Sequence, residues 1–222
     1  HLNRLHSFDM QSGLLTCAAN ISLGELLEVF VPRGWFLPIT PGTKFVSVGG
    51  AIASDVHGKN HHLHGCFSEC VDNIELLLAD GSLIRCSRSD HPELFHATCG
   101  GMGLTGLIVT VTLRLLRIES AYIQQTTFKA ANLDEALQLF ETHSASTYSV
   151  AWIDCLASGA ALGRSLLMVG EHARDGQLLL PTKRALSVPL DMPAALLNRY
   201  SVQAFNELYY QRIRKPESKQ RV

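Results

Sequence analysis

The chain has 222 residues, of which 46% are hydrophobic and 18% are charged. This composition suffices for one complete hydrophobic core and part of a second. The formal net charge of -1 excludes a basic surface that could hold nucleic acid or an anionic membrane, so small molecules are the expected partners.

The first predicted elements are a strand and a helix. An apolar run over residues 13–20 predicts a short strand. Ser22 can cap a helix over residues 23–30, and Glu25 at the third helical position completes a capping box. Prolines and glycines then recur over residues 32–42, so this region and the small-residue run at 46–55 are expected to be rich in loops.

A hairpin and a short helix are predicted next. Two apolar, β-branched runs at residues 74–79 and 83–87 flank Asp80-Gly81, a pair typical of tight hairpin turns. A helix is expected over residues 91–99, with Asp90 as its cap and a proline in its first turn. Alternating residues from 107 to 118 predict a half-buried strand.

A second α+β unit is predicted after residue 120. The pattern indicates a strand at 122–128, a helix at 133–142 and strands at 148–156 and 162–169. From Pro181 onward no clear period remains, and Pro189, Pro193 and Pro216 favour irregular structure. We therefore expect two domains, 1–119 and 120–222.

The chain contains six cysteines without the tight spacing of a small disulfide-rich domain, so reduced and mostly buried thiols are expected. Cys66 and Cys70 lie near four histidines, which makes a zinc site an alternative; the histidines are His57, His61, His62 and His64. These residues form one contiguous loop, whereas zinc sites usually combine two short knuckles or two histidines on a helix. No metal is therefore expected.

Two glycine-rich segments could face a ligand. Gly101, Gly103 and Gly106 match G-x-G-x-x-G, but the predicted order is helix, glycines, strand, and a Rossmann site requires strand, glycines, helix. Close packing explains these glycines, or a flat cofactor that lies near them.

The other segment, Pro41–Asn60, has small side chains from residue 49 to 54. It could direct backbone N–H groups at an anionic or carbonyl-bearing ligand, as a nest or an uncapped helix start does; a tight loop against a sheet is the alternative. His57 is the candidate catalytic residue, because an imidazole can orient a hydroxyl or accept its proton, although a structural histidine would fit too. Lys59 offers a positive charge, or is a surface lysine.

Several long blocks closely resemble one known family. PGTKFVSVGGAIASDVHGKNHH, ADGS, ELFHATCGGMGLTG and YSVAWIDCLASGAALGRS occur in this order. They are similar to the decaprenylphosphoryl-β-D-ribose 2'-oxidase-like FAD-dependent oxidoreductases of the vanillyl-alcohol oxidase / p-cresol methylhydroxylase superfamily. The resemblance covers most of the chain and implies an FAD-binding domain followed by part of a sheet-based cap domain over the substrate.

The resemblance also implies a reaction and a set of site residues. A sugar carbinol would be oxidised to a ketone by hydride transfer to flavin N5, and an electron acceptor would then reoxidise the flavin. His57 and Lys59 would be catalytic, and His57, Gly58, Lys59 and Asn60 would bind substrate. The implied FAD contacts are Gly42, Thr43, Ser47, Val48, Gly49, Gly50, Ala53, Ser54, Asp55, Val56, His57, Gly58 and Ile108.

Two parts of the family pattern are not found in the sequence: the N-terminal phosphate-binding loop and the long C-terminal part. The chain is therefore expected to be the middle of a longer enzyme and inactive alone. A cytoplasmic location is expected, and peripheral membrane contact of the full-length enzyme is left open. The alternatives are an oxidase of soluble sugar alcohols or aldonolactones and, from another class, a non-catalytic fragment or metal-binding module.

Overall fold

The structure, a computed structural model, describes residues 5–179, 198–213 and 217–221. The chain separates into two compact units, His1–Ala121 with Arg174–Leu178 (unit 1) and Tyr122–Ala173 with Leu179–Val222 (unit 2). Each unit combines helices with an antiparallel sheet, which confirms the expected α+β class. The roles expected for the units, cofactor binding and substrate covering, stay predictions.

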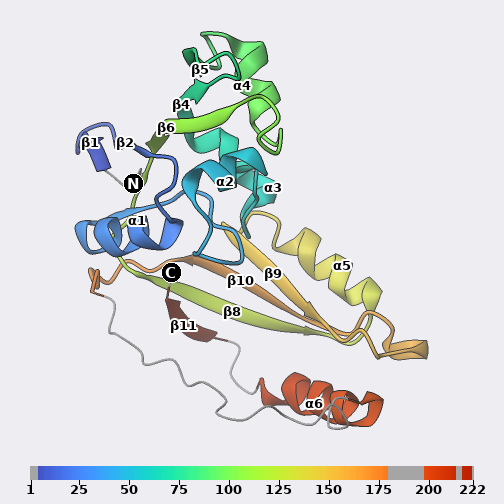
Figure 1. Cartoon of the computed structure of the whole chain (residues 1–222). Coiled ribbons are helices and arrows are strands. Elements are labelled where there is room, and N and C mark those ends of the chain that lie inside the picture. Colours follow the sequence, from blue (N-terminus) through green and yellow to red (C-terminus); the bar gives the residue numbers. More distant parts are fainter. Residues whose placement is uncertain (1–4, 180–197, 214–216, 222) are drawn as a thin grey trace. The chain divides into compact units, whose positions relative to one another are not determined.

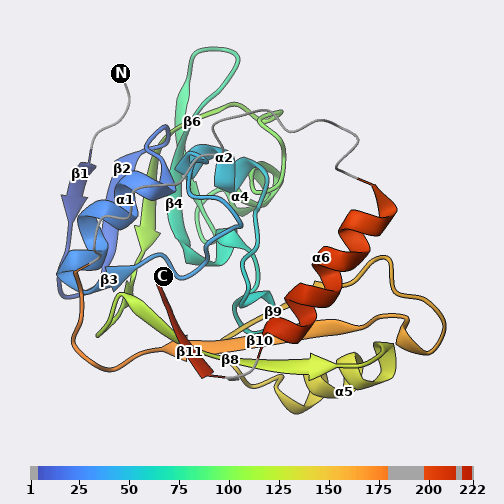
Figure 2. The same ribbon diagram turned by 90° about the horizontal axis from the view of Figure 1, so that it is seen from below.

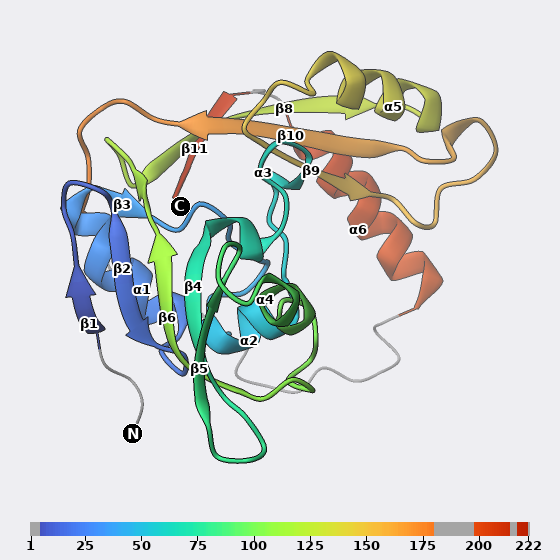
Figure 3. The ribbon, with the colours of Figure 1, turned by 90° about the horizontal axis from the view of Figure 1, so that it is seen from above.

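Unit 1 is built on a five-stranded antiparallel sheet in the order β1-β2-β6-β4-β5, seen from above in Figure 3. The strands are β1 (Leu5–Phe8), β2 (Leu14–Ala18), β4 (Val71–Leu77), β5 (Leu83–Ser87) and β6 (Leu107–Arg114). Alternate residues of these strands point into the core, including Leu15, Val111 and Ile74, all fully buried.

Helices cover the apolar face of this sheet (Figure 1). They are α1 (Leu23–Phe30), α2 (Val48–Ala53) and α4 (Pro92–Thr98), with short 3-10 turns η1 (Val31–Arg33) and η2 (Phe67–Cys70). The short helix α3 (His61–His64) buries none of its residues and takes no part in this core. The capping box of α1 is confirmed: the Ser22 hydroxyl accepts from the Glu25 N–H, and the Glu25 carboxylate accepts from the Ser22 N–H. The predicted hairpin is confirmed as β4 and β5, with Gly81 at φ 84° in the turn.

Three local predictions in unit 1 are wrong. The small-residue run at 46–55 was expected to be rich in loops, but residues 48–53 form the helix α2. The cap residue of α4 is His91, at φ 47°, and not Asp90, whose carbonyl accepts from the Ser87 N–H and so belongs to the preceding turn. The strand predicted over 107–118 is interrupted at Leu115, although the Leu115 N–H still donates to the Gly13 carbonyl. The remainder, β7 (Leu116–Arg117), pairs with β3 (Trp35–Phe36).

Unit 2 is a four-stranded antiparallel sheet in the order β11-β8-β10-β9 (Figure 2). Its strands are β8 (Tyr122–Ala130), β9 (Tyr148–Ile153), β10 (Ser165–His172) and β11 (Glu217–Arg221). The strand predicted over 162–169 begins three residues later, after the 3-10 turn η3 (Gly159–Ala161) and Gly163, whose φ is 79°.

Helices α5 (Leu133–Thr142) and α6 (Arg199–Arg212) lie on opposite faces of this sheet (Figure 1). Phe128 of β8 stacks on His143 at the end of α5, with ring centroids 4.2 Å apart. The next residue along the strand, Lys129, points to the other face, where its ammonium lies 5.0 Å from the Tyr210 ring of α6. The bounds predicted for α5 are confirmed.

The irregular structure predicted beyond Pro181 is wrong where α6 and β11 form; residues 181–197 and Pro216 lie outside the described residues. Long-range contacts hold α6 in place. The buried Asp154 carboxylate accepts from Asn206 Nδ2 and from Arg164 Nη2, both at 2.6 Å. Arg164 Nη1 in turn lies 2.6 Å from a carboxylate oxygen of Glu207. None of these partners is a sequence neighbour, so local periodicity could not indicate the helix.

Candidate functional site

The small-residue segment at the centre of the candidate site is a helix, α2, and its first turn is capped. The Ser47 hydroxyl accepts from the Gly50 N–H at 3.1 Å. The Val48 N–H donates to the Ile21 carbonyl at 2.9 Å, and the Gly49 N–H to the Ala19 carbonyl at 2.7 Å. The expected nest or uncapped helix start is therefore wrong, because the protein itself uses these N–H groups.

The small side chains of α2 have a packing role on one side and leave the other side open. A Cβ atom at Gly49 would lie 3.0 Å from the Ala19 Cβ, so the helix could not approach this neighbour with any larger residue. Gly50 and Ser54, by contrast, are exposed. A flat group can reach the helix backbone on that side without meeting a bulky side chain.

The second glycine cluster docks on the end of α2. The Gly100 N–H donates to the Ile52 carbonyl at 3.0 Å, and the Met102 N–H to the Ala53 carbonyl at 2.8 Å. This confirms the expected packing role, and the order α4, glycines, β6 confirms that no Rossmann turn is present here. Met102, missed by the sequence reasoning, is 69% exposed and lies 3.7 Å from the Ser54 hydroxyl. Its only sequence signal is its place between glycines.

Asp55 connects α2 to the following turn. Its backbone has a φ of 40°, a left-handed conformation that an aspartate tolerates better than most residues. Its carboxylate accepts from the Ser68 N–H at 2.8 Å and from the Ser68 hydroxyl at 3.2 Å. The Asp55 side chain thus stabilises the chain locally, and nothing in the sequence marked Ser68 as its partner.

The turn that follows presents two candidate catalytic side chains to solvent. His57 and Lys59 are both exposed. The backbone of His57 forms an isolated bridge with Cys66, and the His57 ring centroid lies 5.3 Å from that of His61. Gly58 lies so close to Thr40 that a Cβ atom would meet the Thr40 carbonyl oxygen at 2.9 Å. The turn is therefore fixed in its backbone while its side chains are accessible.

Asn60, expected to bind substrate, is only 2% exposed. Its Nδ2 donates to the Pro38 carbonyl at 2.8 Å, and its Oδ1 has no hydrogen-bond partner in the described chain. The side chain joins the 57–60 turn to the proline-rich segment before α2, so the structure gives it a supporting role.

The other predicted cofactor residues fall into three environments. Gly42 and Thr43 lie in an exposed loop, where the Thr43 hydroxyl accepts from the Phe45 N–H at 3.3 Å. Val48 is fully buried and Ile108, on β6, is 8% exposed, and both belong to the core of unit 1. Ala53 and Val56 are half-buried.

The zinc alternative rests on the segment from His57 to Cys70, which contains α3 and η2 and is not the contiguous loop that the sequence predicted. Within the described residues, no group of three or more His, Cys, Asp or Glu side chains could hold a metal ion. Cys66 Sγ lies 3.8 Å from His61 Nδ1, and burial, followed by the charges of Asp55 and Glu69, raises the pKa of the Cys66 thiol. A raised pKa disfavours the thiolate that zinc requires. All six cysteines are free thiols, as expected.

These residues fit FAD by shape more than by a cradle of amide groups. On the open side of α2, Gly50 and Ser54 leave the helix accessible beside the exposed Met102 of the glycine loop, and the 57–59 turn presents polar groups at its end. The first N–H groups of α2 are occupied, so an anionic part of the cofactor must find its donors elsewhere. No helix in the described part of the chain is long and apolar enough to cross a membrane.

Comparison with known proteins agrees with this geometry. A family model described as FAD binding domain matches residues 1–87. The chain is 36% identical over 225 residues to decaprenylphosphoryl-beta-D-ribose oxidase of Mycolicibacterium smegmatis, which covers 95% of the chain and 48% of that protein. An uncharacterized protein in the mprA 5' region of Streptomyces coelicolor is 37% identical over 185 residues, or 80% of the chain and 50% of that protein.

L-gulonolactone oxidase of Bos taurus is 31% identical over 142 residues, which cover 64% of the chain and 31% of that enzyme. The chain thus spans about half the length, or less, of these curated relatives. The matched FAD binding domain includes all of the segment from Pro41 to Asn60. The chain therefore contains an FAD binding domain, in residues 1–87, and is similar over most of its length to an oxidase.

Proposed function

We propose that the protein oxidises a sugar carbinol to a ketone, with FAD as cofactor and a decaprenylphosphoryl-β-D-ribose-like compound as substrate. One observation carries the proposal: His57 and Lys59 are exposed on a turn with a fixed backbone, directly after the small-residue helix of the FAD binding domain. The name of the M. smegmatis relative, 36% identical, supports the substrate class.

The proposed catalytic roles follow from the chemistry of the two side chains. The His57 imidazole orients the substrate hydroxyl and accepts its proton as the carbinol is oxidised. Lys59 supplies a mobile positive charge that stabilises negative charge on the substrate or the cofactor. Bound FAD would supply the hydride acceptor, its N5 atom, and an electron acceptor would complete the cycle.

The proposed cofactor contacts are those on the open side of α2 and the adjoining loops, chiefly Gly42, Gly50, Ser54 and the 57–58 turn. Gly49 and Asp55 support this surface from within, through Ala19 and Ser68 respectively. Asn60 acts on the substrate indirectly, through the turn that it anchors to Pro38.

His57→Ala tests the proposal in the complete, full-length enzyme purified with FAD. Turnover is expected to fall by about 100-fold or more, since general acid–base catalysis contributes that much, while flavin content changes little. His64→Ala is the control, because His64 is also exposed and lies seven residues further on, in α3. Unchanged turnover in His57→Ala would remove the catalytic role. Full-length protein that stays colourless after reconstitution with FAD would remove the proposal altogether.

The second candidate is an oxidase of soluble aldonolactones or sugar alcohols, which the similarity to L-gulonolactone oxidase favours. Rates with a polyprenyl-phosphate pentose, a free aldonolactone and a soluble polyol separate the two. A strong preference for either soluble compound would replace the lipid-linked assignment. Stoichiometric zinc in protein made without a histidine tag would instead favour the non-catalytic, metal-binding alternative.

A further inference from the structure

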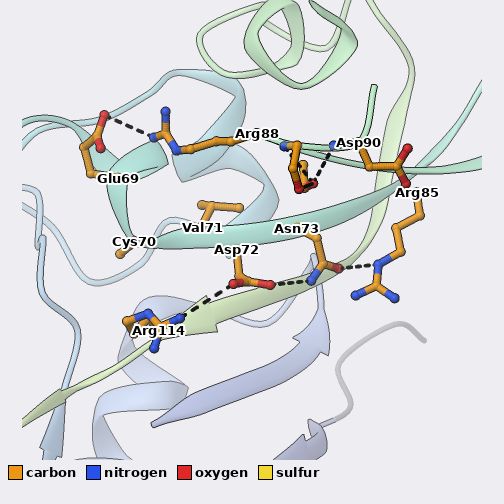
Figure 4. Close-up of a pocket in the computed structure, with 11 residues that line it drawn as sticks. Glu69, Cys70, Val71, Asp72, Asn73, Arg85, Arg88, Asp90 and Arg114 are labelled. Carbon is orange, nitrogen blue, oxygen red and sulfur yellow. Dashed lines mark hydrogen bonds and ion pairs between the residues drawn. The ribbon is translucent and has the colours of Figure 1, made fainter. Parts of the chain in front are cut away.

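A polar pocket of about 550 Å³ lies in unit 1, and none of its lining residues is among the predicted cofactor residues (Figure 4). It is formed where β4 begins and where β5 and β6 end. Its charged lining consists of three arginines and three acids: Arg85, Arg88, Arg114, Glu69, Asp72 and Asp90. The volume falls in the range of small-molecule sites, about 300–1,000 Å³.

A β-bulge brings two successive side chains into this pocket. In the pairing of β4 with β6, Val71 lies opposite Leu113 and Asn73 opposite Thr112, so Asp72 is an extra residue without a partner in the register. A bulge of this kind redirects side chains that would otherwise alternate between faces. Asp72 and Asn73 accordingly meet, with Asn73 Nδ2 donating to Asp72 Oδ2 at 2.9 Å (Figure 4).

The acids of the pocket already have cationic neighbours. Arg114 Nη2 lies 3.7 Å from Asp72 Oδ1, and Arg88 Nη2 lies 3.1 Å from Glu69 Oε1. Arg88 also donates to the Ser68 carbonyl at 3.1 Å. Asp90 lies 3.8 Å from His91 Nε2, an ion pair when that imidazole is protonated.

Arg85 differs from the other two arginines. Its Nε donates to Asn73 Oδ1 at 3.1 Å, a neutral acceptor that Asp72 holds in this orientation. Arg85 forms no ion pair in the described part of the chain, even though Glu75 lies opposite it on β4. The side chain is thus oriented through Nε, which leaves the two terminal nitrogens for another acceptor. A guanidinium presented in this way suits a phosphate or carboxylate group.

We propose that this pocket binds the phosphate group of a small hydroxylated phosphate monoester, with Arg85 as the phosphate ligand. The rest of the lining suits the hydroxyl groups of such a molecule, because the Asp72 and Asp90 carboxylates can accept from them and the Ser89 hydroxyl can accept from or donate to them. The volume exceeds what a lone phosphate ion fills, which favours the ester over the free anion. The site is independent of FAD and of the proposed oxidation.

Calorimetric titration of the chain with glucose 6-phosphate, inorganic phosphate and glucose tests the proposal. Glucose 6-phosphate is expected to bind most tightly and glucose not at all. Arg85→Gln should weaken glucose 6-phosphate binding by about tenfold or more, since charge-assisted hydrogen bonds are lost. Asp72→Asn should have the opposite effect and tighten binding, because it removes a negative charge and retains an acceptor for Asn73.

Arg174→Gln is the matched control, because it makes the same change in net charge at an exposed residue outside the pocket and should leave binding unchanged. Urea unfolding of each variant verifies that unit 1 is folded. Absence of glucose 6-phosphate binding to the unaltered chain at millimolar concentration overturns the proposal, as does equal weakening by Arg85→Gln and Arg174→Gln. Equal affinity for inorganic phosphate overturns the ester assignment.

Discussion

Asn60→Asp is expected to destabilise unit 1 strongly at neutral pH and only weakly in acid. Asn60 is 2% exposed, and its Nδ2 donates to the Pro38 carbonyl at 2.8 Å. The substitution replaces this donor by a carboxylate oxygen that faces the carbonyl oxygen in a buried site. An uncompensated buried charge of this kind typically costs about 3–5 kcal/mol in the free energy of unfolding.

Protonation of the introduced carboxyl limits the loss in the free energy of unfolding and makes that loss depend on pH. A protonated carboxyl can donate to Pro38 and restore the bond, so the pKa of the introduced group is raised in the folded state above its unfolded value of about 3.9. Protonating it costs about 1.4 kcal/mol for each pH unit above that value, or about 4 kcal/mol at pH 7. Because the folded state binds the proton more tightly, the loss should shrink as pH falls and nearly vanish near pH 4.

Urea unfolding followed by tryptophan fluorescence measures this effect. The chain has two tryptophans, Trp35 in the core of unit 1 and Trp152 in unit 2, so a Trp152→Phe background makes the signal specific for unit 1. Asn20→Asp, at an exposed position of the same unit, is the control and should change stability by less than about 0.5 kcal/mol. A small or pH-independent loss in Asn60→Asp would refute the assignment of Asn60 as a buried donor.

Three further predictions concern other positions. Gly58→Ala should lower the free energy of unfolding in urea by about 1–3 kcal/mol, because its Cβ atom would meet the Thr40 backbone at 2.9 Å. Gly42→Ala, with no atom within 4 Å of the added Cβ, should be nearly neutral, and equal effects of the two variants would contradict this. Cys155 is the exposed thiol, so it alone should react quickly with a thiol reagent, and a second fast thiol would count against the structure. Burial lowers the pKa of His172 below its usual 6.5, so the unfolded state binds the proton more readily than the folded state does. The stability of unit 2 should therefore decline as pH falls below about 6.5, and a stability that does not change with pH would refute this.

Local sequence patterns sufficed for elements whose stabilising contacts lie within a turn or two. The Ser22 and Glu25 capping box defined α1, and Asp80-Gly81 defined the β4–β5 hairpin. The spacing of apolar residues over 133–142 predicted the bounds of α5 correctly. In each case the decisive groups are a few residues apart, so propensity and spacing contain the information.

The sequence indicated which segment forms the candidate site. It did not indicate which polar groups of that segment are already hydrogen-bonded within the protein. The segment from Pro41 to Asn60, with His57 at its end, lies within the matched FAD binding domain. The expected use of the α2 amide groups was wrong, because Ile21 and Ala19, more than 25 residues upstream, accept from them. Asn60 was likewise predicted to bind substrate, but in the structure its side chain donates to the Pro38 carbonyl.

The sequence by itself determined the FAD binding domain, the α+β class and the order of most elements. Only the tertiary structure decided which polar groups are occupied and which are left for ligands. It shows that Asp154 holds α6 through Asn206, and that the bulge at Asp72 orients Arg85 toward a pocket. These arrangements join residues distant along the chain, and a buried hydrogen bond forms wherever the fold brings donor and acceptor together, regardless of their separation in sequence.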